Sequence, residues 1–437
     1  MSKIIASYLK KRAQHTHWPM TSRGQDGVEM VVVIPVLAES ERLFLTLGDL
    51  VQNDPECLAH TSVMCVVNNR APEIAGADDC RDNQRILAAL PNFAAAHPTL
   101  RLAWVDASSP GRELGPKEGV GLARKIGLDW GLQILHENNV PQGPLISLDG
   151  DTRVGNDYLA AIRSFFESPT GWAAVVDYAH PTAGDSDETR AILAYEFFLR
   201  YQELALHYAQ SPYHYPAIGS TMICTAEAYS ASGGMNRRQA GEDFYFLQQL
   251  AKTGQVDRIR DTTVVPASRP SHRVPFGTGR KVGAYAQDED DAYLIYNPTT
   301  YDVIRRWLHT AQGGLAHGGA ALLEQAQAID PELGRFLEQQ QFETAWDRVL
   351  GQCKSDGQRQ RQFHAWFDGF RTLKLTHHLR DHGHPRQDLF EALAVLLELQ
   401  GIKTPQRPTS ALRHDLDGQR ALLDILRGHR LDPLDSI

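Results

Sequence analysis

The sequence predicts an α/β domain, with a mostly parallel sheet flanked by helices, followed by an all-α C-terminal domain. From residue 31 to about residue 265, short β-branched apolar runs alternate with longer segments of helical periodicity, which is typical of β-α-β units. After about residue 288 the strand-like runs nearly vanish, and apolar residues recur at helical spacing. We therefore expect a helical extension over 1–28, the α/β domain over 29–287 and the helical domain over 288–437.

The individual elements follow from the same patterns. Strands are expected at 30–35, 62–68, 100–106, 145–149, 173–178 and 262–265. The first three are nearly continuous apolar runs, as expected when helices cover both faces of a sheet. Helices are expected between the strands over 40–53, 119–138, 157–167 and 189–209. In the C-terminal domain they are expected over 301–311, 320–328, 331–350, 360–377, 386–399 and 419–426.

Charge and cysteine content restrict the class of protein. Lys and Arg total 44 against 53 for Asp and Glu, so the formal net charge of -9 does not supply the broad positive field of a non-specific nucleic-acid binder. The five cysteines are scattered and form no CxxC pair, which disfavours a disulfide framework or a four-thiolate zinc site. A reducing compartment fits best, and we expect a cytoplasmic protein.

No integral membrane segment is expected. The longest apolar run, 31–38, is too short to cross a bilayer and contains Pro35. Residues 1–12 are basic but lack the apolar core of a signal peptide. We interpret them as a solvated, partly packed helix, with peripheral membrane contact as the alternative.

The clearest chemical signal is Asp149-Gly150-Asp151, which follows an apolar strand. Ligands of open α/β sheets bind at the carboxyl ends of strands, and residues i and i+2 of an extended segment project the same way. Two convergent carboxylates suit Mg²⁺ or Mn²⁺. The alternative is a polar turn that closes the strand, because Asp-Gly is a common turn dipeptide.

A second acidic pair, Glu242 and Asp243, precedes an amphipathic helical pattern. Acidic residues in a first helical turn are stabilised by the helix dipole, which is one explanation. The functional alternative is a general base acting on an acceptor hydroxyl. Small residues at 219–224 and 232–235 indicate a surface that a ligand can approach closely.

Taken in order, these motifs resemble those of family 2 glycosyltransferases of the GT-A fold, which transfer a sugar from a nucleotide-diphosphate donor. The matching segments are 31–36 with Glu39, 66–69, 121–127, 149–151, and 233–234 followed by 241–243. The resemblance spans about residues 31 to 281 and does not cover the C-terminal helical part.

The resemblance implies roles for individual residues. Pro35, Val36 and Glu39 would border the nucleotide, and Asn68 or Asn69 would lie near the base, where many relatives carry aspartate, so the base stays open. For the donor diphosphate it implies a pocket residue, Arg124, and an Asp-x-Asp metal motif, Asp149, Gly150 and Asp151. The alternative for Arg124 is a surface or structural ion pair.

The same resemblance assigns the base. Asp243 matches the carboxylate that relatives use as base, with Glu242 as its companion.

Residues 269–281 combine a histidine and several cations with glycines, which is typical of a flexible lid. His272 is a candidate third metal ligand by its position, and Arg273 and Arg280 would neutralise the diphosphate. The alternative is a polar loop whose histidine is merely exposed. A second histidine group, at 377–384, places His378 and His382 at i and i+4. It lacks an HExxH motif, and capping at a helix C-terminus explains it more simply.

The sequence therefore predicts metal-dependent transfer of a hexosyl-type sugar from a nucleotide-diphosphate donor to an acceptor hydroxyl, inverting, with Asp243 as base. One alternative is a retaining synthase of the glycosylglycerate type. Others are a sugar nucleotidyltransferase, although the Gly-rich basic loop after the first strand is missing, and a non-catalytic sugar-binding protein. The sugar, the acceptor and the oligomeric state stay open.

Overall fold

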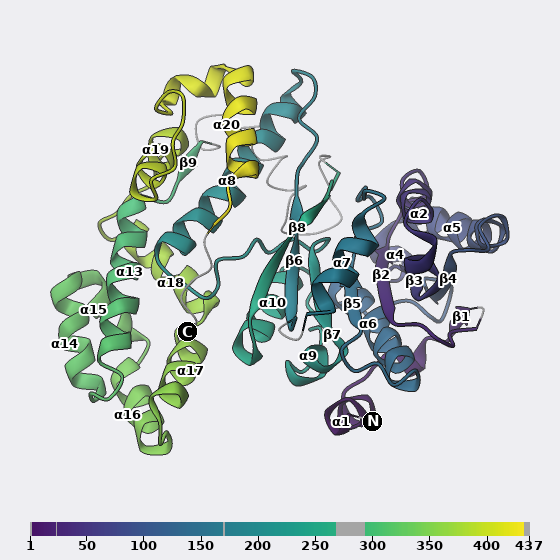
Figure 1. Ribbon diagram of the computed structural model, residues 1–437, viewed down its shortest axis with the longest axis horizontal. Helices are drawn as coiled ribbons and strands as arrows, with labels where there is room; N and C mark the ends of the chain where they lie inside the picture. Colours follow the sequence, from purple (N-terminus) through teal and green to yellow (C-terminus); the bar gives the residue numbers. More distant parts are fainter. Residues whose placement is uncertain (1, 23, 169–170, 268–292, 432–437) are drawn as a thin grey trace. The chain divides into compact units, whose positions relative to one another are not determined.

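The computed structural model describes residues 2–22, 24–168, 171–267 and 293–431 (Figure 1). By internal contacts the chain divides into two compact units. Unit 1 comprises Met1–Pro181 and Ala217–Lys281, and unit 2 comprises Thr182–Pro216 and Val282–Ile437. The long helix of residues 187–208 therefore groups with the C-terminal helices rather than with the sheet that precedes it.

Unit 1 is built on a mostly parallel sheet with strand order β1-β4-β3-β2-β5-β7-β6-β8. Its strands are β1 Met20–Ser22, β2 Met30–Val36, β3 Thr61–Asn68, β4 Arg101–Ala107, β5 Pro144–Ser147, β6 Ala173–Tyr178, β7 Met222–Thr225 and β8 Val256–Val264. The neighbours β4, β3, β2 and β5 are parallel, as are β6 and β8. β1 and β7 run antiparallel to their partners. The predicted α/β class is confirmed.

Helices flank this sheet (Figure 1). They are α1 Lys3–Lys11, α2 Leu43–Val51, α3 Pro55–Ala59, α4 Pro72–Ala75, α5 Ala77–Ala96, α6 Val120–Glu137, α7 Tyr158–Phe166, α9 Ala226–Ala231 and α10 Glu242–Thr253, with a short 3-10 helix at His15–His17. Helix α1 packs against α6 and α9, so the predicted N-terminal helix is present and partly buried.

Helix α6 lies directly against the central strands. A Cβ at Gly127 would overlap the side chain of Val33, and a Cβ at Gly131 would lie 2.8 Å from Leu145 Cδ2. Side chains alternate along a strand, so Val32 faces away from α6, and it is buried as well. Both faces of the central sheet are therefore covered.

Unit 2 is helical, as the sequence predicts. Its helices are α8 Asp187–Tyr208, α13 Pro298–Gly313, α14 Gly319–Ile329, α15 Pro331–Gln339, α16 Phe342–Gln352, α17 Asp356–Trp366, α18 Gly369–Asp381, α19 Leu389–Leu399 and α20 Leu416–Gly428. A 3-10 helix, Ser410–His414, and a two-stranded pair, β9 Leu294–Ile295 with β10 Gln387–Asp388, complete it. One apolar core, rich in aromatic side chains, joins these helices.

Some expected boundaries are wrong, and the reasons are local. The segment 331–350 splits because Gln341 adopts a left-handed conformation with φ of 55°. The segment 360–377 splits at Asp368, whose side chain accepts from Arg371 N and caps α18. Strand β5 ends at Ser147, so Asp149 lies in the following turn. Strands β1 and β7 and helix α5 were not expected; β1 and β7 are only 3 and 4 residues long.

Among the residues that the structure describes, no helix combines the length and the apolar character needed to cross a bilayer.

The packing of α6 can be tested with two glycine substitutions. Gly127→Ala should destabilise the protein by about 1–3 kcal/mol, because the added methyl group overlaps Val33. The matched control is Gly48→Ala in α2, where, apart from neighbouring residues of the same helix, no atom lies within 4 Å of the new Cβ. The control should raise stability by about 0.5–1 kcal/mol, because alanine lowers the backbone entropy of the unfolded chain. Urea unfolding measures both, and equal midpoints for the two variants would contradict the packing described.

Candidate functional site

Among the described residues, several of the predicted site residues lie at one edge of the unit 1 sheet. Strands β3, β2 and β5 are adjacent and parallel, so their carboxyl ends share an edge. Pro35 and Val36 end β2, Asn68 ends β3, and Asp149 follows β5. A Cβ at Gly150 would lie 3.6 Å from Glu39 Cγ and 3.7 Å from the Pro35 carbonyl oxygen, so the loops after β2 and β5 touch.

The buried guanidinium of Arg124, on α6, connects the two predicted acidic motifs. Nη2 donates to Asp149 Oδ1 at 2.6 Å, and Nε donates to Glu242 Oε1 at 3.0 Å. Nη1 donates to Ser147 Oγ at 2.6 Å and to the Gly219 carbonyl at 3.2 Å. Burial alone would lower the pKa of Arg124, but the carboxylates outweigh it and raise this pKa above its ordinary value. Arg124 therefore stays charged in a buried position.

Two small residues, unassigned by the sequence analysis, complete the surroundings of Asp149. Ser220 Oγ donates to Asp149 Oδ2 at 2.6 Å and contacts Thr152 Oγ1 at 2.8 Å. A Cβ at Gly219 would lie 2.9 Å from Arg124 Cζ, so glycine leaves the room that the guanidinium occupies. Both residues precede β7, a strand that the sequence analysis missed, although it noted small residues over 219–224.

Helix α10 begins at the second acidic pair. Gly241 adopts a left-handed conformation with φ of 70°, and the buried Glu242 opens the helix. The half-buried Asp243 accepts from Phe244 N at 2.7 Å. Desolvation and the neighbouring Glu242 raise the pKa of Asp243 to about 7, with Phe244 N–H and Arg124 acting in the opposite direction. Asp243 can therefore exchange a proton near neutral pH.

An asparagine from α5 joins the loops after β2 and β3. Asn83 Nδ2 donates to Asn69 Oδ1 at 2.8 Å and to the Asn68 carbonyl at 3.0 Å. Its Oδ1 accepts from Ala38 N at 2.9 Å, where Ala38 has a positive φ of 52°. Asn68 itself donates to the Val36 carbonyl at 2.9 Å. Because α5 was not expected, sequence reasoning missed Asn83.

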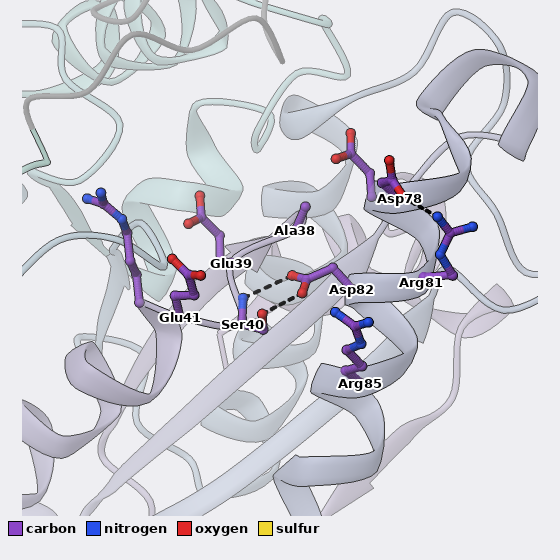
Figure 2. Close-up of a pocket in the computed structure, with 10 residues that line it drawn as sticks. Ala38, Glu39, Ser40, Glu41, Asp78, Arg81, Asp82 and Arg85 are labelled. Atoms are coloured by element: carbon purple, nitrogen blue, oxygen red, sulfur yellow. Dashed lines mark hydrogen bonds and ion pairs between the residues drawn. The ribbon is translucent and has the colours of Figure 1, made fainter.

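A pocket of about 360 Å³ lies beside Glu39 (Figure 2). Its walls are the loop after β2 and the first turns of α5, and Asp82 accepts from Ser40 N at 3.0 Å across one wall. The lining is almost entirely charged: Ala38, Glu39, Ser40, Glu41, Arg42, Asp78, Asp79, Arg81, Asp82 and Arg85. The pocket suits a polar ligand group rather than an apolar one.

The predicted metal ligands can be compared with the donor set that Mg²⁺ or Mn²⁺ requires. Asp149 and Asp151 supply carboxylate oxygens, which these hard ions prefer, from a turn whose central Gly150 lies close to the end of β2. Both side chains are partly exposed, so water and substrate oxygens can reach them. The type of donor therefore suits a divalent ion, and an ion on Asp149 would share its oxygens with Arg124 Nη2 and Ser220 Oγ, which donate to Oδ1 and Oδ2. His272, Arg273 and Arg280 lie outside the described residues.

Comparisons with known proteins find distant structural neighbours. No family model and no curated protein sequence matches the chain. One similar structure is S. aureus TarS 1–349, at 11% identity and a TM-score of 0.36, covering 92% of this chain and 89% of that one. The structure of the same protein in complex with UDP-GlcNAc has 12% identity and a TM-score of 0.39, covering 77% of this chain and 91% of that one.

A third is the mannosyltransferase PcManGT from Pyrobaculum calidifontis in complex with GDP-Man and Mn²⁺, at 15% identity and a TM-score of 0.36, covering 86% of this chain and 90% of that one. Scores this low transfer neither ligand nor activity to the chain, so its function must be inferred from its own residues.

The role of Arg124 can be tested by removing its charge. Arg124→Met should destabilise the protein by about 3–5 kcal/mol, because the buried Glu242 loses its partner. Arg153→Met, the control, breaks an exposed pair with Asp49 and should cost no more than about 1 kcal/mol. Arg124→Lys should not restore stability, since one ammonium cannot reproduce the fork of donors. Denaturant unfolding measures all three, and a loss for Arg124→Met no larger than the control's would refute the role.

Proposed function

We propose that unit 1 is a GT-A-type catalytic unit that transfers a sugar from a nucleotide-diphosphate donor to an acceptor hydroxyl with the help of a divalent metal ion. The observation that carries this proposal is the link from Arg124 to both acidic motifs, through Asp149 at 2.6 Å and Glu242 at 3.0 Å. The proposed cation-binding turn and Glu242, which directly precedes the candidate base Asp243, thus belong to one connected group. This arrangement favours an enzyme over a binding scaffold.

The donor would lie along the carboxyl edge of the sheet. Pro35, Val36 and Glu39 would border the nucleoside, with Asn68 and Asn69 near its base. Hydrogen bonds from Asn83 hold the backbone and side chain of this asparagine pair, so the base would meet a fixed surface. The charged pocket beside Glu39 gives the ribose or base room for polar contacts.

Asp149 and Asp151 would hold the metal ion. When bound, Mg²⁺ or Mn²⁺ neutralises the negative charge that develops on a departing diphosphate. The donors of Arg124 go to protein acceptors, so we propose that it orients Asp149 and Glu242 rather than serving as the main partner of the diphosphate.

Asp243 would act as the base. The acceptor oxygen attacks the anomeric carbon, the bond from that carbon to the diphosphate oxygen breaks, and the acceptor proton passes to Asp243. A single displacement of this kind inverts the anomeric configuration. The pKa of about 7 suits this role, because the carboxylate is present at neutral pH yet basic enough to take a proton.

Donor binding can be tested by thermal unfolding with UDP, GDP, ADP, CDP and dTDP, each with and without Mn²⁺. A ligand at 100 times its Kd should stabilise the protein by about 2.7 kcal/mol. The proposal expects a Mn²⁺-dependent shift with at least one nucleotide, lost in Asp149→Ala. Asp257→Asn serves as the control, since this half-buried acid of β8 lies outside the proposed site. No shift with any nucleotide would contradict the proposal.

The base can be tested by substitution and by pH. Asp243→Asn should keep the nucleotide shift and lower the rate of transfer by about 10²–10⁴. In the unaltered enzyme, kcat/KM should be level at high pH and fall roughly tenfold for each unit once the pH drops below the pKa of Asp243, because the carboxylate that takes the proton becomes protonated. This pKa is about 7 without the metal ion, and bound Mn²⁺ should lower it. Normal turnover by Asp243→Asn would exclude it as the base, and retention of the anomeric configuration in the product would exclude the single displacement.

A further inference from the structure

Unit 2 contains a group of three side chains that the proposed transferase chemistry does not use. Glu332 lies on α15, His378 lies on the last turn of α18, and His382 caps that helix. One ligand atom from each lies within 4.8 Å of the other two. We propose that Glu332, His378 and His382 bind a zinc ion that joins α15 to α18.

The spacing of the ligand atoms supports this site. His378 Nε2 lies 3.2 Å from Glu332 Oε2. Two ligands of a tetrahedral zinc ion at bond lengths of 2.0–2.1 Å lie about 3.3 Å apart, so this pair already has the separation that the ion requires. A carboxylate and two imidazoles form a ligand set that zinc accepts, with the fourth position left to water.

The hydrogen bond of His382 prepares its other nitrogen. Nδ1 of His382 lies 2.8 Å from the His378 carbonyl oxygen, which can only accept, so Nδ1 carries the proton. Nε2 of His382 then presents a lone pair. Zinc-bound histidines commonly donate their second ring nitrogen to a carbonyl or carboxylate in this way, which fixes the tautomer.

The surrounding contacts let the three side chains bind zinc with only a small rearrangement. The rings of His378 and His382 stack with centroids 4.3 Å apart, so chelation must separate the two ring planes. His382 is exposed and can make this movement without loss of core packing. Arg335 pairs with Glu332 Oε1, which leaves Oε2 on the side of the histidines.

The neighbouring histidine belongs to a separate pair. His384 Nε2 lies 3.0 Å from Asp330 Oδ2, while the other Asp330 oxygen caps α15 by accepting from Glu332 N at 2.8 Å. The His378–Glu332 and His384–Asp330 pairs already join α15 to the end of α18 and the residues after it. Zinc binding would strengthen the first pair and add His382 to it. The expected consequence is a stabilising clip within unit 2, independent of donor binding in unit 1.

Titration of the full-length protein with Co²⁺, followed by visible absorption, tests the site. Tetrahedral Co²⁺ absorbs strongly, and the proposal expects a saturating band at about one equivalent that Zn²⁺ removes. His382→Ala and Glu332→Gln should each weaken binding by at least about tenfold, and Zn²⁺ should raise the melting temperature of the unaltered protein but not of these variants.

Two further variants separate this site from others. His309→Ala removes an exposed histidine of α13 in the same unit and should leave the band unchanged. Asp149→Asn should also leave it unchanged, whether or not the proposed transferase function holds. Absence of the band, or a band that persists at full affinity in both His382→Ala and Glu332→Gln, would overturn the proposal.

Discussion

The buried guanidinium of Arg124 connects the parts of unit 1 that the proposed site requires. It donates to Asp149, in the turn after β5, to Glu242, at the start of α10, and to the Gly219 carbonyl, ahead of β7. These segments lie far apart in the sequence. A neutral side chain there would leave the buried carboxylate of Glu242 without its cation, which is strongly unfavourable. The cation therefore fixes both acids relative to the sheet before any ligand arrives.

This arrangement also explains the electrostatics of the candidate base. Arg124 contributes one positive charge beside the carboxylates of Asp149, Glu242 and Asp243, so negative charge prevails among these four groups. The raised pKa of Asp243 expresses that imbalance together with desolvation. A divalent ion on Asp149 and Asp151 would shift the balance and favour the charged form of Asp243. Metal binding by Asp149 and Asp151 and proton transfer to Asp243 are therefore coupled in the proposed mechanism, although these acids belong to different motifs.

Sequence patterns predicted most of the sheet, because β2, β3 and β4 are nearly continuous apolar runs between turn residues. They missed β7, whose position is set by pairing with β5 and β6. Ser220 was missed with it. Asn83 was missed together with α5, and a single polar residue within a helix would in any case give no local sign that it holds two distant loops.

Local sequence likewise does not show ligand sets whose members come from separate helices or strands. The spacing of His378 and His382 is visible in the sequence, but the partner that gives it chemical meaning, Glu332, lies on another helix. Without Glu332, capping of the helix end explains both histidines, and His382 does make that backbone contact. Glu332 Oε2 lies 3.2 Å from His378 Nε2. The backbone contact of His382 Nδ1 then has a second consequence, because it leaves Nε2 of His382 ready to coordinate a metal ion. Local sequence can indicate which side chains are able to bind, whereas tertiary packing decides which of them meet.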